Sequence, residues 1–316
     1  MRPWIFLLLA AFSGLASGQP YPSKPVRIIV AFAPGGPIDV VARLIAPRMS
    51  EILGEAVIVE NRPSTTGALG TVAVKTSAAD GYTILANSSA FAVTPSLTTS
   101  AGYDPIKDFA PIAQVATQPN VIVVNSKFPA NTLAELIAVA KKQKLAYASP
   151  GAGTTPHLTA EHLFKVIEKL DIVHIPHKGA GPAAAAIVSG EPPIGSLAVT
   201  SPLPHIRAGR MRGLAISSAK RNPQLPDVPT FIELGYPQIQ DYTWVGLFAP
   251  AGTPPEIVQK LNDAVNRALQ DANIRARLDS LTFEPIGGSS QHFADYLKIE
   301  VAKWAKVVKE TGAKVD

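Results

Sequence analysis

Two glycine-rich segments could do chemistry, because each follows an apolar run and precedes residues at helical spacing. Residues 34–37 (Pro-Gly-Gly-Pro) follow residues 26–30, and residues 149–155 (Ser-Pro-Gly-Ala-Gly-Thr-Thr) follow residues 144–148. A helix that begins on such a turn directs unpaired backbone N–H groups, and the positive end of its dipole, at the space above the strand. That arrangement binds anions, and neighbouring hydroxyls suit a carboxylate.

Polar residues at the ends of other predicted strands extend this candidate site. Hydroxyl, amide and imidazole side chains there can donate hydrogen bonds, and glycines allow a positive φ or a close approach to a ligand. From the residue types we expect ligand contacts at Gly35, Gly36, Thr65, Thr66, Gly67, Asn87, Ser88, Ser149, Gly151, Gly153, Thr154, Thr155, His157, His177 and Thr200.

Asp39 and Arg43 are four residues apart on the helix predicted after the first glycine segment. The simplest interpretation, which we favour, is an ion pair on the helix surface, with Asp39 also near the favourable end of the dipole. The alternative is that Asp39 orients the glycine segment or meets an amine on the ligand. Two roles also stay open for His157, which could donate into a cleft or pack inside the protein.

Metal, cofactor and enzyme motifs are scarce in this sequence. His174 and His177 are three residues apart, which places them on opposite faces of a strand, so we expect no metal site. The sequence has no G-x-S-x-G and no Walker motif, and Pro156 replaces the third glycine of a dinucleotide fingerprint. We expect no bound cofactor and no catalytic residue.

Strands and helices alternate along the chain, which predicts an α/β fold with a parallel sheet. The two glycine segments lie in two similar α/β units, at the carboxyl ends of strands, where open sheets bind ligands. Strands flanking residues 117–120, together with strand 242–249, are the natural crossings between the units and would form a hinge. We expect strands at 26–30, 56–60, 82–86, 110–115, 121–124, 144–148, 172–175, 194–199, 211–217 and 242–249, and helices from 37, at 70–77, 133–142, 157–170, 182–188, 256–270, 274–281 and 290–311, with a short helix within the loop 222–236.

Composition narrows the class of protein. The 316 residues are 47% hydrophobic and include no cysteine, which excludes disulfides and thiolate chemistry. The net charge of +5 is scattered, so nucleic acid is not an expected partner. Arg2, the apolar stretch 4–12 and small residues at 16–18 predict a secretory signal peptide over residues 1–18, with an exported, periplasmic mature protein.

Several motifs, in this order, resemble one known family over nearly the whole mature chain. The sequence is similar to the Bug-type extracytoplasmic solute receptors of tripartite tricarboxylate transporters. The resemblance is carried by Tyr21-Pro22, Lys24-Pro25, residues 32–43 (Phe-Ala-Pro-Gly-Gly-x-x-Asp-x-x-Ala-Arg), 59–63 (Val-Glu-Asn-Arg-Pro), 80–83, 103–109, 157–158, 178–179, 225–230 (Leu-Pro-Asp-Val-Pro-Thr) and 249–254.

The resemblance implies a two-domain periplasmic binding protein of type II, a Venus flytrap with a hinge of two crossing strands. Domain 1 would comprise residues 19–116 and 247–316, and domain 2 residues 117–246. Backbone groups and ordered water of the first two loops would hold a carboxylate, and domain 2 would read the rest of the ligand. Carried over by position, the first-loop residues are Phe32, Ala33, Pro34, Gly35, Gly36 and Asp39.

Two departures from the family pattern lie near the expected cleft. Residues 63–67 read Pro-Ser-Thr-Thr-Gly where the family usually has Pro-Gly-Ala-Gly-Gly, and His177 stands where a tyrosine is usual. We therefore expect a monomeric receptor for a small carboxylate that delivers it to the membrane subunits of a transporter. The alternatives are an exported enzyme that uses His157 or His177 as a base, and a ligand sensor without a transport role.

Overall fold

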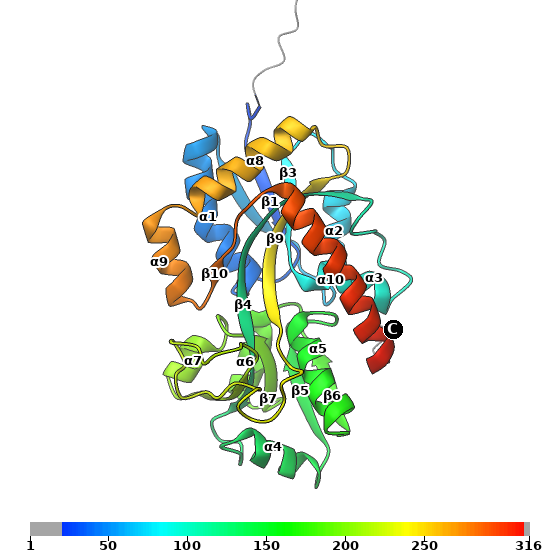
Figure 1. The fold of residues 1–316 in the computed structure, drawn as a ribbon, viewed down its shortest axis with the longest axis vertical. Coiled ribbons are helices and arrows are strands. Elements are labelled where there is room, and N and C mark those ends of the chain that lie inside the picture. Colours follow the sequence, from blue (N-terminus) through cyan, green and yellow to red (C-terminus); the bar gives the residue numbers. More distant parts are fainter. Residues whose placement is uncertain (1–20, 313–316) are drawn as a thin grey trace, which may run out of the picture.

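The computed structural model describes residues 21–312, which form two lobes one above the other (Figure 1). The sheet runs through both lobes in the order β2-β1-β3-β9-β4-β7-β5-β6, with β8 and β10 also paired to β4. This confirms the predicted α/β architecture of two units. The predicted signal peptide, residues 1–18, lies outside the described residues.

The first lobe is built on a parallel core of strands β2, β1 and β3, as the alternation in the sequence predicts. These three strands lie within one residue of their predicted positions. The elements of this lobe are β1 (Val26–Val30), α1 (Pro37–Leu53), β2 (Val57–Asn61), α2 (Ala68–Lys75), β3 (Thr83–Asn87), α3 (Ser89–Leu97), α8 (Pro255–Ala268), α9 (Ala272–Ser280), β10 (Glu284–Pro285) and α10 (Ser290–Thr311).

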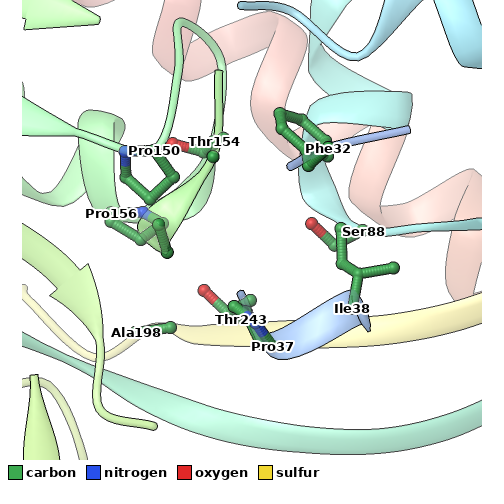
Figure 2. A pocket seen from close by; sticks show the side chains of 11 residues that line it. Phe32, Pro37, Ile38, Ser88, Pro150, Thr154, Pro156, Ala198 and Thr243 are labelled. Carbon is green, nitrogen blue, oxygen red and sulfur yellow. The ribbon is translucent and has the colours of Figure 1, made fainter. Parts of the chain in front are cut away.

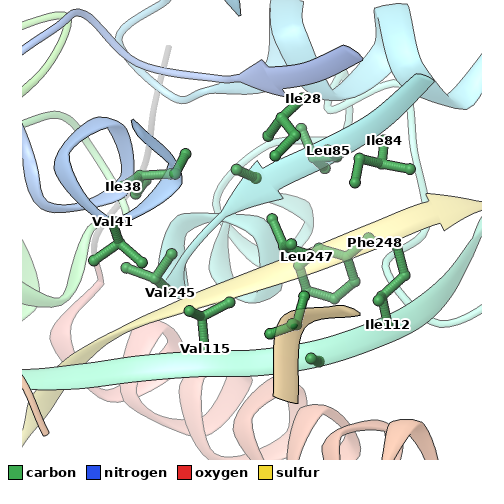
Figure 3. Close-up of a cluster of buried hydrophobic side chains, with 14 of the residues drawn as sticks. Ile28, Ile38, Val41, Ile84, Leu85, Ile112, Val115, Val245, Leu247 and Phe248 are labelled. Atoms are coloured by element: carbon green, nitrogen blue, oxygen red, sulfur yellow. The ribbon is translucent and has the colours of Figure 1, made fainter. Parts of the chain in front are cut away.

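The core of the first lobe fixes α1, and therefore the loop before it. Ile38 and Val41 on one face of α1 pack against strand residues such as Ile28 and Val245 (Figure 3). The helix ends at Gly54, which adopts a left-handed conformation with φ +78° and donates its N–H to Ser50 O. Burial of this apolar face anchors the helix, so that its N-terminus points at the second lobe.

The part of the sheet that lies in the second lobe has an apolar layer on each face. Ile122, Tyr147 and Phe164 belong to one layer, and Val121, Ile187 and Leu197 belong to the other. The elements of this lobe are α4 (Leu133–Ala140), β5 (Leu145–Ser149), α5 (Thr155–Glu161), the π-helical turn η1 (His162–Ile167), β6 (Ile172–Pro176), α6 (Ala180–Ser189), β7 (Ile194–Ala198), α7 (Leu203–Arg207) and β8 (Met211–Ile216).

Two long antiparallel strands connect the lobes. β4 (Phe109–Asn125) and β9 (Tyr242–Pro250) pair from Phe109 opposite Pro250 to Pro119 opposite Tyr242, and both run from one lobe into the other (Figure 1). The predicted crossing by two strands is confirmed. The prediction of two separate strands around residues 117–120 is wrong, because pairing to β9 keeps this polar stretch inside one continuous strand.

The local structure also differs from the expectations elsewhere in the chain. Residues 89–97 form helix α3, which we did not predict. Seven of its nine residues are buried, so the helix needs no polar face and its sequence shows no amphipathic pattern. Residues 222–236 form turns instead of including a short helix. The helix predicted at 157–170 begins at Thr155 and changes to π-helical geometry after Glu161.

Helix α10 reaches from the first lobe toward the second (Figure 1). Its residues Trp304 and Val308 form an apolar cluster with Val93 and Leu97 of α3 and with Leu158 of α5. The cluster therefore joins both lobes on one side of the molecule. Within residues 21–312, no helix is both long and apolar enough to span a membrane.

Candidate ligand-binding site

A small cavity lies where the two lobes meet. It has a volume of about 30 Å³. Figure 2 shows Phe32, Ser88 and Ile38 from the first lobe facing Thr154 and Pro156 from the second. Ligand sites are typically about 300–1,000 Å³, so the lobes must separate to admit even a small molecule. The complete lining is Phe32, Pro37, Ile38, Ser88, Pro150, Thr154, Pro156, Gly179, Ala180, Ala198 and Thr243.

Four helices, two from each lobe, begin at this cavity. Their first residues or N-caps are among the lining residues: α1 begins at Pro37, α3 is capped by Ser88, α5 is capped by Thr154, and α6 follows Gly179. Each N-terminus contributes a partial positive charge, which favours an anion near the meeting point of the helices, while the surface that lines the closed cavity is almost entirely apolar. The sequence predicted two of these helix starts as anion sites, at α1 and α5.

Backbone N–H groups without an acceptor occur at helix starts in both lobes. The N–H groups of Ile38 and Asp39 on α1, and of Ala180 and Gly181 on α6, have no hydrogen-bond acceptor among residues 21–312. These groups come from opposite lobes and from helices that start at the same cavity. They are the donors that a carboxylate requires.

Asp39 holds the first loop in place. Its Oδ2 accepts from the Gly35 N–H at 3.0 Å, and its Oδ1 accepts from Asn61 Nδ2 and Arg43 Nε at 2.9 Å each. The expected ion pair with Arg43 is therefore confirmed, and the same carboxylate also orients the glycine loop, the alternative role. Both carboxylate oxygens are occupied by protein groups.

The lobes contact each other through hydrogen bonds around the cavity. The Ala33 N–H donates to Lys178 O at 2.8 Å, Ser201 Oγ donates to Gly35 O at 3.3 Å, and the Thr155 N–H donates to Ser89 Oγ at 2.9 Å. Each bond joins a loop of one lobe to a loop or helix start of the other. The structure therefore represents the closed arrangement of the two lobes.

Glycines allow the closest approaches across this interface. A Cβ on Gly151 would lie 2.1 Å from Thr65 O, and a Cβ on Gly181 would lie 2.6 Å from Pro34 O. A Cβ on Gly179, whose φ is +146°, would lie 3.0 Å from the Ala33 nitrogen. No side chain larger than hydrogen fits at these positions while the lobes are closed.

The second loop meets the second lobe through its backbone. Thr65 contributes its carbonyl to the contact with Gly151, while the Thr66 hydroxyl accepts from the Ala68 N–H at 3.3 Å and the Thr66 carbonyl accepts from Thr94. Gly67 has a φ of +73° and lies against the ring of Phe32. The two threonine side chains predicted as ligand donors therefore do not line the closed cavity.

Asn87 and Ser88 have different positions although they are adjacent. Asn87 is fully buried, and it joins α2 and α3 by donating to Thr71 Oγ1 at 2.9 Å and accepting from the Ser88 N–H at 2.8 Å. Ser88 lines the cavity. Asn87 thus places Ser88 rather than facing the cavity itself.

The glycine loop of the second lobe is fixed from behind by buried polar side chains. Ser149 Oγ lies 2.6 Å from His174 Nε2, and Thr154 Oγ1 donates to Gly151 O at 2.7 Å. The Gly153 N–H donates to Nδ1 of His157 at 3.1 Å. These bonds define the course of the loop before any ligand contact is made.

His157 packs inside the second lobe instead of entering the cleft. It stacks on His174 with ring centroids 4.0 Å apart, and its Nε2 lies 3.9 Å from Glu161 Oε1. Burial lowers the pKa of His157 to about 3, and burial together with His157 lowers the pKa of His174 to about 3. Of the two roles left open by the sequence, packing is the one observed.

These neutral histidines make the protein less stable in acid. In the unfolded chain a histidine titrates near 6.5, so between pH 6.5 and 3 the unfolded state binds more protons than the folded state. We expect His157 alone to lower the free energy of unfolding by about 2 kcal/mol between pH 7 and 5. Urea unfolding at the two pH values measures this loss. His157→Gln should reduce it, whereas His292→Gln, on the exposed start of α10, should not; equal losses in both variants would contradict the assignment.

His177 and Thr200 lie at the edge of the closed interface. The His177 N–H donates to Ser149 O at 3.0 Å, and its carbonyl lies 3.2 Å from a Cβ built on Gly151. Burial lowers the pKa of His177. Thr200 bonds to Gln118 on the crossing strand and to Leu281 in the first lobe. Neither residue lines the cavity.

Sequence reasoning missed most of the apolar lining. Pro37 and Ile38 lie just inside a predicted helix start, and could have been found from that position alone. Ala198 and Thr243 lie on strands from distant parts of the chain, and nothing in their local sequence marks them. In residues 21–312 no three histidine, cysteine or acidic residues are grouped as metal ligands.

Comparison with known proteins agrees with this architecture. The model of the family described as "Tripartite tricarboxylate transporter family receptor" matches residues 41–313. Protein BugT of Bordetella pertussis is 38% identical over 98% of this chain and 96% of its own length.

Two solved structures from Rhodopseudomonas palustris are also similar. Rpa4515 with adipate is 34% identical with a TM-score of 0.89, over 93% of this chain and all of that one. MatC with bound malate is 33% identical with a TM-score of 0.87, over 91% of this chain and all of that one. With a family match over most of the sequence, and relatives similar along their full length, this chain belongs to the tripartite tricarboxylate transporter receptor family.

Proposed function

We propose that the protein is a receptor that captures a small carboxylate between its lobes. The observation that carries this proposal is the meeting of four helix N-termini, two from each lobe, at one cavity. Free N–H groups at the starts of α1 and α6 would bind the carboxylate from both sides. Adipate and malate in the two similar structures support the same ligand class.

Ligand contact in this proposal is made by the residues at the cavity and by the loops that carry them. Ser88, Thr154 and Thr243 supply hydroxyl groups, and Phe32 and Ile38 supply apolar surface. Asp39, Asn87, Ser149 and His157 position these loops. The remaining predicted residues would contact the ligand only if opening and closing rearranges the second loop and the segment around His177.

Ligand capture would proceed by rotation of the lobes about β4 and β9. A ligand stabilises the closed arrangement only as far as it binds that arrangement more tightly than the open one. Donors from both lobes provide this difference, because they converge on one anion only after closure. We divide the lobes at the crossing strands, with residues 19–116 and 247–316 in one and residues 117–246 in the other.

An exported enzyme is the less favoured alternative. His157 is buried, its pKa is lowered to about 3, and its Nδ1 already accepts a bond from Gly153, so it is poorly suited to act as a base. The family to which this chain belongs is described as one of transporter receptors, which also favours a binding protein. We propose further that the protein acts as a monomer in the periplasm, after removal of residues 1–18, and delivers its ligand to membrane transporter subunits.

A thermal-shift screen of the mature protein tests the ligand class. A ligand that binds only the folded state raises the melting temperature, and at a hundredfold excess over its Kd the stabilisation is about 2.7 kcal/mol. We expect mono- or dicarboxylates to shift the transition and the corresponding amides and amines to leave it unchanged. Each hit is then measured by calorimetry with protein that has been unfolded, dialysed and refolded, which removes any ligand carried from the cells.

Two results would contradict the proposal. Shifts by neutral amides alone would overturn the carboxylate as ligand, and turnover of a bound acid would favour the enzyme. Small-angle scattering supplies an independent readout, because capture between the lobes predicts a smaller radius of gyration with ligand than without it.

A further inference from the structure

The three hydroxyl groups that line the cavity differ in what they can offer a ligand. Ser88 caps α3 without a side-chain hydrogen bond, so its hydrogen is free to be donated. Thr154 Oγ1 donates its hydrogen to Gly151 O at 2.7 Å, and Thr243 Oγ1 donates its hydrogen to Asn120 Oδ1 at 2.6 Å. A hydroxyl has one hydrogen and two lone pairs. The two threonines can therefore only accept from a ligand.

The direction of the Thr243 hydrogen bond is determined by the amide of Asn120. Asn120 Nδ2 donates to Asp241 Oδ1 at 2.6 Å. A carboxylate oxygen accepts, so the amide nitrogen of Asn120 faces Asp241 and the amide oxygen faces Thr243. Thr243 must then be the donor, because two acceptors cannot pair. Asp241 is itself held by Thr159, whose Oγ1 lies 2.7 Å from Oδ2 of Asp241.

The orientation of the Asn120 amide belongs to the fold and does not depend on a ligand. Asn120 is fully buried on β4. Its N–H donates to Ser217 Oγ at 2.8 Å, and its carbonyl accepts from the Ser217 N–H at 2.9 Å. Ser217 Oγ in turn donates to the Asp241 carbonyl at 2.5 Å. Asn120 and Asp241 are thus fixed to the same serine, and their relative positions are set before any ligand binds.

Thr243 carries this fixed orientation to the cavity. It lies on β9 and lines the cavity together with Pro156 and Ala198, and Figure 2 shows its oxygen on the side that faces Pro156. Among residues 21–312, no group donates to Thr243 Oγ1. Its neighbours in the lining are apolar, so they cannot pair with its lone pairs. A buried acceptor without a donor is costly, and a donor on a ligand would remove that cost.

The electrostatics of the cavity restrict the kind of donor. A ligand can donate from an ammonium group or from a neutral hydroxyl. Four helix N-termini meet at the cavity, and their partial positive charges disfavour a cation there. The closed cavity is also small, at about 30 Å³, so a donor that reaches Thr243 must lie within a few bonds of the carboxylate. These conditions favour a hydroxyl close to the carboxylate.

We propose that Thr243 is a specificity-determining residue, which accepts a hydrogen bond from a ligand hydroxyl and so selects hydroxycarboxylates over the same acids without the hydroxyl. Asn120 and Asp241 are positioning residues, which act through Thr243. A ligand carbonyl in place of the hydroxyl brings an acceptor against an acceptor and is rejected. The inference rests on the proposed function and specifies which carboxylates the receptor prefers.

Sets of acids that share one carbon skeleton test this preference by calorimetry. One set is propionate, lactate, 3-hydroxypropionate, pyruvate and alanine, and a longer one is glutarate, 2-hydroxyglutarate and 2-oxoglutarate. In each set that binds, we expect the best hydroxy acid to bind about tenfold more tightly than the parent acid. The oxo acid should bind more weakly than the parent, and alanine more weakly than lactate.

Two substitutions of the same residue separate specificity from a structural role. Thr243→Val keeps the shape and removes the hydroxyl, so the affinity ratio of hydroxy acid to parent acid should fall from about tenfold to about one. Thr243→Ser restores the hydroxyl and should restore the ratio. A residue that only stabilises the fold would lower the affinity for every acid alike and leave the ratio unchanged.

A buried threonine outside the cavity is the matched control. Thr253 is 6% exposed, and its hydroxyl donates to Pro250 O at 2.8 Å. Thr253→Val and Thr243→Val each leave a buried oxygen without its donor, so both should lower the melting temperature. Only Thr243→Val should change the affinity ratio.

The outcomes distinguish this inference from the proposed function. If wild type binds no carboxylate in the thermal-shift screen, the function fails and the inference with it. If it binds carboxylates but prefers no hydroxy acid to its parent, or if Thr243→Val keeps the wild-type ratio, the role of Thr243 is wrong while the receptor function stands. Tighter binding of alanine than of lactate would overturn the hydroxyl as the donor.

Discussion

The Gly181→Ala protein is expected to fold as stably as wild type and to lose at least a hundredfold of its ligand affinity. Gly181 lies in the first turn of α6, where its φ is compatible with any residue, and alanine is a better helix former than glycine. The added methyl group affects only the closed arrangement. There its carbon would lie 2.6 Å from Pro34 O, a distance that Cβ atoms in real structures essentially never show.

The contact is with backbone on both sides, so neither partner can move aside by changing a rotamer. Pro34 precedes Gly35, whose N–H is fixed by Asp39, and α6 is packed on the second-lobe sheet through Ala183 and Ile187. Relief therefore requires the lobes to stay apart. If the lobes stay apart, the N–H groups of α1 and α6 cannot bind the same anion. The ligand then binds the closed arrangement no more tightly than the open one, and capture depends on that difference.

Calorimetry with the best ligand, together with small-angle scattering with and without it, measures this effect. The matched control is Ala185→Ser, which adds one atom at an exposed position of the same helix and should change neither affinity nor ligand-induced compaction. Wild-type affinity in Gly181→Ala would show that closure of the α6 start on the first loop is not needed for binding.

The Asp39→Asn protein is expected to be destabilised by about 1–3 kcal/mol and to bind its ligand at least tenfold more weakly. Asp39 is buried, whereas its partner Arg43 is half exposed, which moderates the cost through solvent screening. Gly35, Asn61 and Arg43 all donate hydrogen bonds to the Asp39 carboxylate. In asparagine an NH2 group replaces one of the two carboxylate oxygens, so a hydrogen-bond donor then faces another donor. The first loop then loses the bond that holds Gly35.

Urea unfolding and calorimetry on the same samples measure the two effects. Asp295→Asn is the control, since that aspartate pairs with Lys298 on the exposed face of α10 and should change stability by less than about 0.5 kcal/mol. Loss of stability with unchanged affinity would mean that the loop keeps its course without Asp39, and would remove the orienting role.

The sequence contains the information for strands, helices and loops wherever local chemistry is sufficient. Residues 26–43 read as strand, turn and helix because the apolar run is short, prolines bracket the glycines, and Ile38, Val41 and Ile45 repeat at helical spacing. The same reasoning predicted both glycine loops, the alternation of elements and the two crossing strands, and family motifs added the two-lobe architecture.

Local chemistry was misleading where tertiary contacts dominate. The stretch 117–120 has few strand-forming residues, yet β9 on one side and β7 on the other pair with β4 and keep it extended. Helix α3 has no polar face to reveal its period, because it is enclosed by the first-lobe core, α10 and the glycine loop of the second lobe.

By itself the sequence determined where helices begin and which of those starts could attract an anion, because caps, glycines and apolar spacing act over a few residues. Only the tertiary structure decided that four such starts share one cavity and that His157 is buried behind its loop. The shared cavity joins residues as far apart in the sequence as Pro37 and Gly179. Both arrangements depend on lobe packing and strand register, which no local pattern encodes.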